Sequence, residues 1–140
     1  MNPYRNYRQS GPAAGSTRIE LLLSLYDGAL ERLDQAETAL KAGNPQGAVP
    51  HLIKAQLIVS ALASGVRTGI NEEMATNMLR LYEFVVRQLA TPDIQKIIDA
   101  RMVLNNLRAG FDAIRDEAIQ LERTGQIPPA EQMQLILTSA

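Results

Sequence analysis

The histidine at position 51 is the residue of this sequence best suited to acid–base chemistry. It is the one histidine of the 140-residue chain, and the chain contains no cysteine. Lys54 follows three residues later, which places both side chains on the same face of a helix, one turn apart. His51 is therefore the only conventional general base, and Lys54 gives it its one suggestive context.

The His51-x-x-Lys54 spacing resembles the phosphoacceptor helix of histidine phosphotransfer domains, which are four-helix bundles of similar length. In those domains a helical histidine takes a phosphoryl group, and a nearby lysine offsets its charge. Two residues depart from the pattern: Pro50 directly precedes His51, and Ala55 stands where a glycine usually follows the lysine. A solvated histidine near the start of a helix is the other interpretation, and both stay open at this point.

Other catalytic and metal chemistries lack the residue types they need. One histidine and no cysteine exclude thiol nucleophiles, zinc sites with two imidazoles or thiolates, and di-iron bundles built on two Glu-x-x-His pairs. Acid pairs such as Glu72/Glu73 and Asp116/Glu117 are adjacent in sequence, so they splay around a helix instead of converging. The sequence predicts that the protein is not an enzyme and has no catalytic residues, no cofactor and no metal.

The composition favours a water-soluble helical protein. Fourteen Lys and Arg residues against 15 Asp and Glu residues leave a net charge of −1, so we expect no nucleic-acid partner. We find neither an apolar run approaching the ~18 residues of a membrane helix nor the apolar core of a signal peptide, which predicts a cytoplasmic protein without membrane insertion. Hydrophobic residues make up 46% of the chain and aromatic residues 4%, which indicates an aliphatic core carried by helices.

Apolar residues at steps of three and four predict an all-α fold, an antiparallel four-helix bundle. Residues 1–16 read as a flexible N-terminal arm, residues 17–124 as the bundle, and residues 125–140 as a C-terminal tail or short helix. The first helix is expected at 17–42 and the fourth at 92–123, with two helices between them. The expected apolar seam of the fourth helix is Ile97, Ala100, Leu104, Leu107, Phe111, Ile114, Ala118 and Leu121.

Helix start and stop signals support these elements. Thr17 and Glu20 have the spacing of a capping box at the start of the first helix, and Gly43 supplies a left-handed stop. Asn44 and Asn71 are expected to cap the second and third helices. Pro50 lies one turn too deep in the second helix, so we expect a kink or a late start there.

The informative anomaly is a surplus of apolar residues on the second and third helices. From Ala48 to Val66, 12 of 19 residues are apolar, whereas a core stripe of three in seven would use about eight. Such helices either have neighbours on two sides or wait for a partner helix, and the chain's own arm and tail are an alternative cover. The surplus residues lie beside the core seam Leu52, Ala55, Val59 and Leu62 and the stripe Met74, Met78, Leu81, Val85 and Leu89; they are Ile53, Leu57, Ile58, Ala61, Leu79, Tyr82 and Val86.

Several segments, in the same order, resemble the FliS family of flagellar export chaperones, with Ser24, Phe84 and Phe111 as departures from its usual Met, Tyr and Trp. The N-terminal Asn-Pro-Tyr with Tyr7 is similar to the family's Asn-Pro-Tyr-x-x-Tyr, and four helical segments also match. These are LLLSLYDGALERL (21–33), LIKAQLIVSAL (52–62), LYEFVVRQL (81–89) and LRAGF (107–111).

The resemblance implies a binding protein without catalysis. Members of the family hold the disordered C-terminal segment of flagellin in the cytosol, prevent premature polymerisation and present the subunit to the export gate. The implied partners are that flagellin segment, the cytosolic domain of the export gate and other flagellar regulators. Tyr4 and Tyr7 would act as a displaceable lid over the groove for the client, and the surplus residues would bind it. The chain itself is expected to be a monomer or a weak homodimer; a plain homodimer that buries the second apolar face is the remaining alternative.

Overall fold

A computed structural model describes residues 15–67, 69 and 71–126, and all regular structure in these residues is helical. The expected all-α fold class is confirmed. The chain divides into two compact units: one is Leu25–Leu107, and the described part of the other consists of residues 15–24 and 108–126. The helices of the described chain are α3 (Arg18–Lys41), α4 (Pro45–Ser64), α5 (Glu72–Gln88), α6 (Ile94–Ala113) and α7 (Arg115–Arg123).

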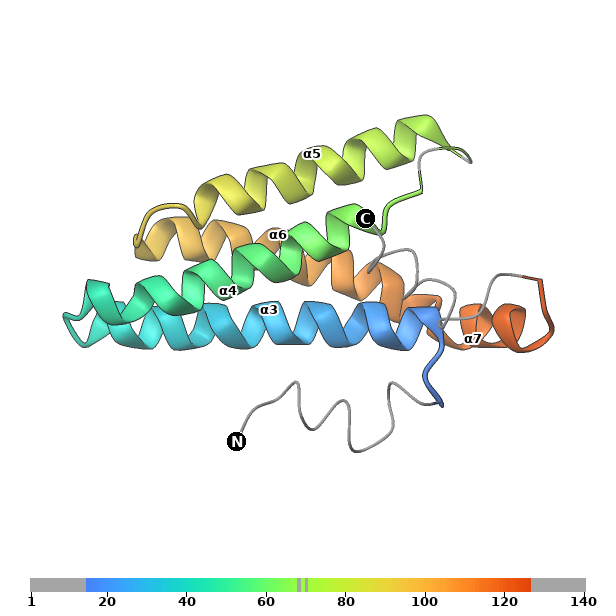
Figure 1. Ribbon diagram of the computed structural model, residues 1–140, viewed down its shortest axis with the longest axis horizontal. Helices are drawn as coiled ribbons and strands as arrows, with labels where there is room; N and C mark the ends of the chain where they lie inside the picture. Colours follow the sequence, from blue (N-terminus) through green and yellow to red (C-terminus); the bar gives the residue numbers. More distant parts are fainter. Residues whose placement is uncertain (1–14, 68, 70, 127–140) are drawn as a thin grey trace. The chain divides into compact units, whose positions relative to one another are not determined.

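The unit Leu25–Leu107 contains most of α3 and α6 and all of α4 and α5. Successive helices run in opposite directions and are joined by short connections (Figure 1). Their apolar faces meet in a core that is mainly aliphatic, as the composition predicts, and that also contains two tyrosines. The buried side chains of this unit are Tyr26, Ala29, Leu33 and Ala36 of α3; Ala48, Leu52, Ala55, Ile58, Val59 and Leu62 of α4; Ala75, Tyr82, Val85 and Leu89 of α5 and its end; and Ile97, Ala100 and Leu104 of α6.

The predicted caps of this unit are confirmed. The Asn44 side chain accepts a hydrogen bond from the N–H of Gly47 at 2.9 Å, and the Asn71 side chain accepts one from the N–H of Met74 at 3.0 Å. Gly43 has a φ of +74°, a conformation that favours glycine, and lets the Asn44 N–H reach the Ala39 carbonyl at 2.8 Å.

The expected late start at Pro50 is wrong, because α4 begins at Pro45 and continues through Pro50. Pro45 occupies the first helical position, where a missing N–H costs nothing. The bond lost at Pro50 frees the carbonyl of Gln46, and both residues are exposed, so water can satisfy that group.

In the smaller unit, α3 begins directly after Thr17, as predicted. The Glu20 carboxylate accepts hydrogen bonds from the Thr17 N–H at 3.1 Å and from the Thr17 hydroxyl at 2.8 Å. The hydroxyl bond, then the backbone bond, lower the pKa of Glu20. The Arg18 N–H donates to the Glu122 carboxylate of α7 at 2.9 Å, which links α7 to the first residue of α3.

The predicted fourth helix is two helices, and this part of the prediction is wrong. At Ile114 the N–H bonds to the Phe111 carbonyl at 3.2 Å, a tight turn that interrupts the α-helical bonding between α6 and α7. Ile114, expected on the apolar seam, is 48% exposed. Apolar spacing reports which residues share a face, and that spacing continues across a break of one residue, so periodicity does not detect it.

The buried stripe of α5 also differs from the predicted one. Met74 and Leu81 were expected in the core and are 60% and 38% exposed, whereas Ala75 and Tyr82 are buried. Tyr82 is buried because its hydroxyl is hydrogen-bonded to that of Tyr26, so its polar end is satisfied inside the core. Burial raises the pKa of both phenols.

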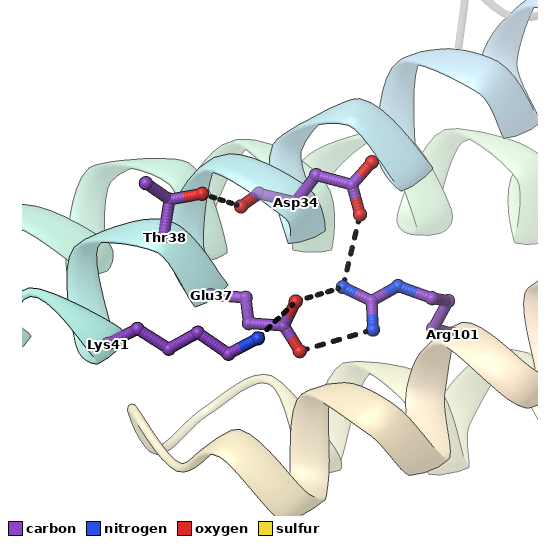
Figure 2. A network of polar contacts seen from close by, with 5 residues as sticks. All are labelled: Asp34, Glu37, Thr38, Lys41 and Arg101. Atoms are coloured by element: carbon purple, nitrogen blue, oxygen red, sulfur yellow. Dashed lines mark hydrogen bonds and ion pairs between the residues drawn. The ribbon is translucent and has the colours of Figure 1, made fainter.

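A polar network joins α3 to α6 at the surface of this unit. Figure 2 shows the Arg101 guanidinium between two carboxylates of α3: it lies 3.1 Å from Asp34 and 3.4 Å from each oxygen of Glu37. Lys41 lies 3.7 Å from Glu37 on its other side. Because one arginine contacts two residues one turn apart, the network fixes the register of the two helices better than a single exposed pair would.

Candidate functional site

An exposed apolar stripe runs along α4, and we take it as the candidate site. Val49, Ile53 and Leu57 follow each other at intervals of four residues, so they stand one above the other on one face. Their side chains are 39%, 50% and 65% exposed. The buried residues of α4 occupy the opposite face, which means that this helix is apolar on two sides. We call these three residues the α4 stripe.

The residues predicted to bind a partner differ in exposure: some are exposed, some half-buried and two lie in the core. Ile53 and Leu57 are exposed, whereas Ala61, Leu79 and Val86 are half-buried. Tyr4 and Tyr7 lie outside the described residues.

Ile58 and Tyr82 are core residues, so their expected place on an exposed face is wrong. Ile58 is 5% exposed and points at α3, where a Cβ added to Gly28 would lie 3.6 Å from its Cδ1 atom. Ile58 therefore packs against α3 beside Gly28, and the α4 core face is wider than the predicted seam. Tyr82 is 1% exposed and is held in the core by its bond to Tyr26.

Next to the α4 stripe, α4 packs against α5. The Gln56 side chain donates a hydrogen bond to the Val86 carbonyl at 2.9 Å, which links the two helices through a side chain and a backbone group. Val86 is thus part of the packed contact between the helices more than part of a free surface. The half-buried Leu79 lies two turns before it on α5.

Sequence patterns missed several other exposed apolar side chains of this unit. On α5, Met74 and Leu81 are exposed and their neighbours Ala75 and Tyr82 are buried, whereas Val85 and Leu89 are buried as predicted. The Tyr82 hydroxyl, which needs a buried partner, is the signal that could have corrected the first two positions. On α6 the predicted stripe left Ile98 and Met102 unassigned. The missed residues are Met74, Leu81 and Phe84 of α5, Ile98 and Met102 of α6, and Val49 of α4.

His51 is engaged in a contact that opposes nucleophilic chemistry. Its Nδ1 atom lies 3.2 Å from the Arg32 guanidinium. Because arginine only donates, Nδ1 accepts and the ring proton stays on Nε2. Partial burial, then the charges of Arg32 and Lys54, lower the pKa of His51 and favour this neutral form. Neither ring nitrogen therefore offers a free lone pair for phosphoryl transfer.

Two other observations bear on the kind of site. Within the described residues, no group of three or more His, Cys, Asp or Glu side chains could hold a metal ion. By length and composition alone, α4 is apolar enough to cross a membrane. One such helix is weak evidence for a membrane span, and six residues of α4 are buried in its unit.

The fold and the site define a helical-bundle protein with exposed apolar surface. A family model described as "Flagellar protein FliS" matches residues 1–118, and the chain belongs to the FliS family. It is similar to the flagellar secretion chaperone FliS of Bacillus subtilis strain 168, with 29% identity over 123 residues, 88% of this chain and 90% of that protein. The corresponding chaperone of Vibrio cholerae is 25% identical over 121 residues, 84% of this chain and 89% of that protein. That of Escherichia coli K12 is 28% identical over 89 residues, 61% of this chain and 63% of that protein. Membership of this family supports a flagellar export chaperone and not an enzyme.

Proposed function

We propose that this chaperone acts in the cytoplasm and binds the disordered C-terminal segment of flagellin, holding it until export. The observation that carries the proposal is the α4 stripe, in which Val49, Ile53 and Leu57 expose apolar surface on a well-formed helix. A client segment that folds as an amphipathic helix can cover such a stripe with anchors at the same spacing. Membership of the FliS family supports a role in flagellar export. The α4 stripe is the surface that we propose for client binding.

The energetics of the stripe suit a client that must be released. Each exposed Ile, Leu or Val that the client buries contributes about 1.5–3 kcal/mol. The client pays an ordering cost when it folds on binding, so the net affinity stays moderate. Reversible capture of this kind protects the segment from polymerisation and still permits transfer to the export gate.

The N-terminal arm enters the proposal as a competitor of the client. Tyr4 and Tyr7 are amphipathic side chains that can cover an apolar groove without forming a long helix. Deletion of residues 1–14 should strengthen client binding or raise the binding of an apolar dye. Unchanged flagellin affinity and unchanged dye fluorescence would show that the N-terminal arm is not a lid. They would not contradict client binding at the α4 stripe.

The proposal is tested by titrating a fluorescently labelled flagellin C-terminal segment with variants of the full chain. Leu57→Asp should weaken binding about tenfold or more, because an apolar anchor is lost and a carboxylate must be desolvated. Far-UV helicity and thermal unfolding should stay unchanged, since Leu57 is 65% exposed in the free protein. Val86→Asp is a poorer test because Val86 is half-buried.

Met102→Asp is the matched control, because Met102 lies on α6 and is 59% exposed. The substitution introduces the same charge as Leu57→Asp. Equal effects of the two variants, or none from Leu57→Asp, would show that the α4 stripe is not the client surface. Loss of function in His51→Gln alone would favour phosphotransfer. Sedimentation at low concentration separates the homodimer alternative, in which Leu57→Asp would dissociate the protein in the absence of flagellin.

A further inference from the structure

A cationic cluster borders the α4 stripe on one side. Leu57 and Lys54 are three residues apart on α4, and so are Lys54 and His51, so the three side chains are successive neighbours on the helix surface. The Arg32 guanidinium of α3 joins the series through its 3.2 Å contact with His51. The apolar anchor Leu57 is thus continuous with a patch that carries two full positive charges.

No carboxylate of the described residues neutralises the two charges of this cluster. The hydrogen bonds of Arg32 go to neutral acceptors, the Gln35 side chain at 3.3 Å and the ring of His51. Arg101, by contrast, lies between Asp34 and Glu37. Within the described residues neither Arg32 nor Lys54 has a carboxylate within ion-pair distance.

The cluster is also held in place. Arg32 is partly buried between its own helix and α4, and His51 accepts from it, so the guanidinium is oriented before any partner arrives. A preoriented cation with free donors binds a carboxylate better than a freely moving surface lysine does, because less side-chain entropy is lost. Lys54 is exposed one turn further along α4 and supplies the second charge.

We infer that the helical client segment on the α4 stripe presents carboxylates to Arg32 and Lys54, so that this cluster selects amphipathic helices with an acidic flank and sets their rotation on α4. The inference rests on the proposed function and adds the chemistry of the client: apolar anchors at intervals of four residues, with Asp or Glu on one side only. Opposite charges at the edge of an apolar interface add specificity and speed association more than they add affinity.

The salt dependence of binding tests this inference. Arg32→Gln and Lys54→Gln should each raise the Kd of the flagellin C-terminal segment about threefold to tenfold at low salt, and both should reduce the dependence of Kd on salt. Lys41→Gln removes the same charge from the exposed end of α3, where Lys41 pairs with Glu37, and should leave both quantities unchanged. If all three variants behave alike, the effect is one of net charge and the inference is wrong.

Zero-length carbodiimide coupling of the wild-type complex provides a second readout. It should join the Lys54 amine to an Asp or Glu of the client through an amide that peptide mass spectrometry locates. No coupling at Lys54, with salt-independent binding that Leu57→Asp still abolishes, would overturn this inference and leave the proposed function in place. Binding that is insensitive to Leu57→Asp would overturn the proposed function itself.

Discussion

The hydroxyl groups of Tyr26 and Tyr82 are hydrogen-bonded to each other inside the core, with their ring centroids 6.5 Å apart. The pair joins α3 to α5, two helices that are not consecutive in the chain. An apolar contact tolerates small slips along a helix, whereas a hydrogen bond between two buried hydroxyls does not, because a slip breaks it and leaves the buried Tyr82 hydroxyl unsatisfied. The pair therefore fixes the position of α5 and, through the packing of α5 on α4, supports the helix that carries the stripe.

Removal of one hydroxyl should lower the free energy of unfolding by more than half of the stabilisation that the pair provides. Tyr26→Phe leaves the Tyr82 hydroxyl without its partner in a buried place, and the free energy of unfolding should fall by about 1–3 kcal/mol. The Tyr26→Phe/Tyr82→Phe double variant should be less destabilised than the two single variants added together. Urea unfolding followed by far-UV circular dichroism measures all four proteins of this cycle. Additive effects would mean that the two hydroxyls do not interact in solution.

The same pair predicts a loss of stability at alkaline pH. Its folded pKa values lie above the unfolded value of about 10, since burial disfavours the phenolate. Below pH 10 both states keep the proton, so the pair adds no pH dependence to the free energy of unfolding. Above it the unfolded chain ionises first, so the free energy of unfolding falls as pH rises. The double Phe variant should show a shallower fall; identical alkaline profiles would contradict buried phenols.

Gly28 offers a test of the close contact between α3 and α4. A methyl group added there would meet the Ile58 Cδ1 atom at 3.6 Å, an ordinary van der Waals distance. Gly28→Ala should thus raise stability by about 0.5–1 kcal/mol through helix propensity alone. Gly28→Leu should destabilise, because the larger side chain has to displace Ile58. A lower melting temperature for the alanine variant would show that the helices lie closer in solution than here.

The two leucines Leu104 and Leu107 of α6 should respond unequally to truncation. Leu104 is fully buried, so Leu104→Ala should cost about 2–5 kcal/mol through lost burial and a residual cavity. Leu107 is half-buried, so Leu107→Ala should lower the free energy of unfolding clearly less, although the apolar pattern assigns both residues to one seam. Equal losses in chemical denaturation would show that Leu107 is as deeply buried as Leu104.

The sequence predicts helices, caps and fold class well because these depend on local chemistry. Asn44 and Asn71 cap their helices through short side chains that reach the nearest N–H groups, which spacing alone reveals. The sequence predicts the rotation of α5 less well, because apolar residues surround much of this helix and two apolar stripes compete for the core. Ile58 and Tyr82 were misplaced because both pack against α3, Ile58 beside Gly28 and Tyr82 through the Tyr26 hydroxyl, and neither neighbour is visible in the local pattern.

The candidate site was partly predictable for the same reason. The surplus of apolar residues identified Ile53 and Leu57 correctly as exposed, since α4 contains more apolar residues than one core face can use. Arg32 was not found, because its contact with His51 joins residues 19 positions apart on two helices. His51 with Lys54 one turn further along allowed a phosphotransfer interpretation. The contact of His51 with Arg32 on α3 argues against that interpretation.

Methyl chemical shifts report whether the client contacts α4 without any substitution in the protein. The wild-type protein, carrying ¹³C-labelled Ile, Leu and Val methyl groups, is titrated with the flagellin C-terminal segment. The methyl signals of Ile53 and Leu57 should shift in proportion to client occupancy, while that of Ile98, which is also exposed but on α6, should stay in place. Shifts at Ile98 with none at Ile53 and Leu57 would contradict the assignment of the client surface to α4.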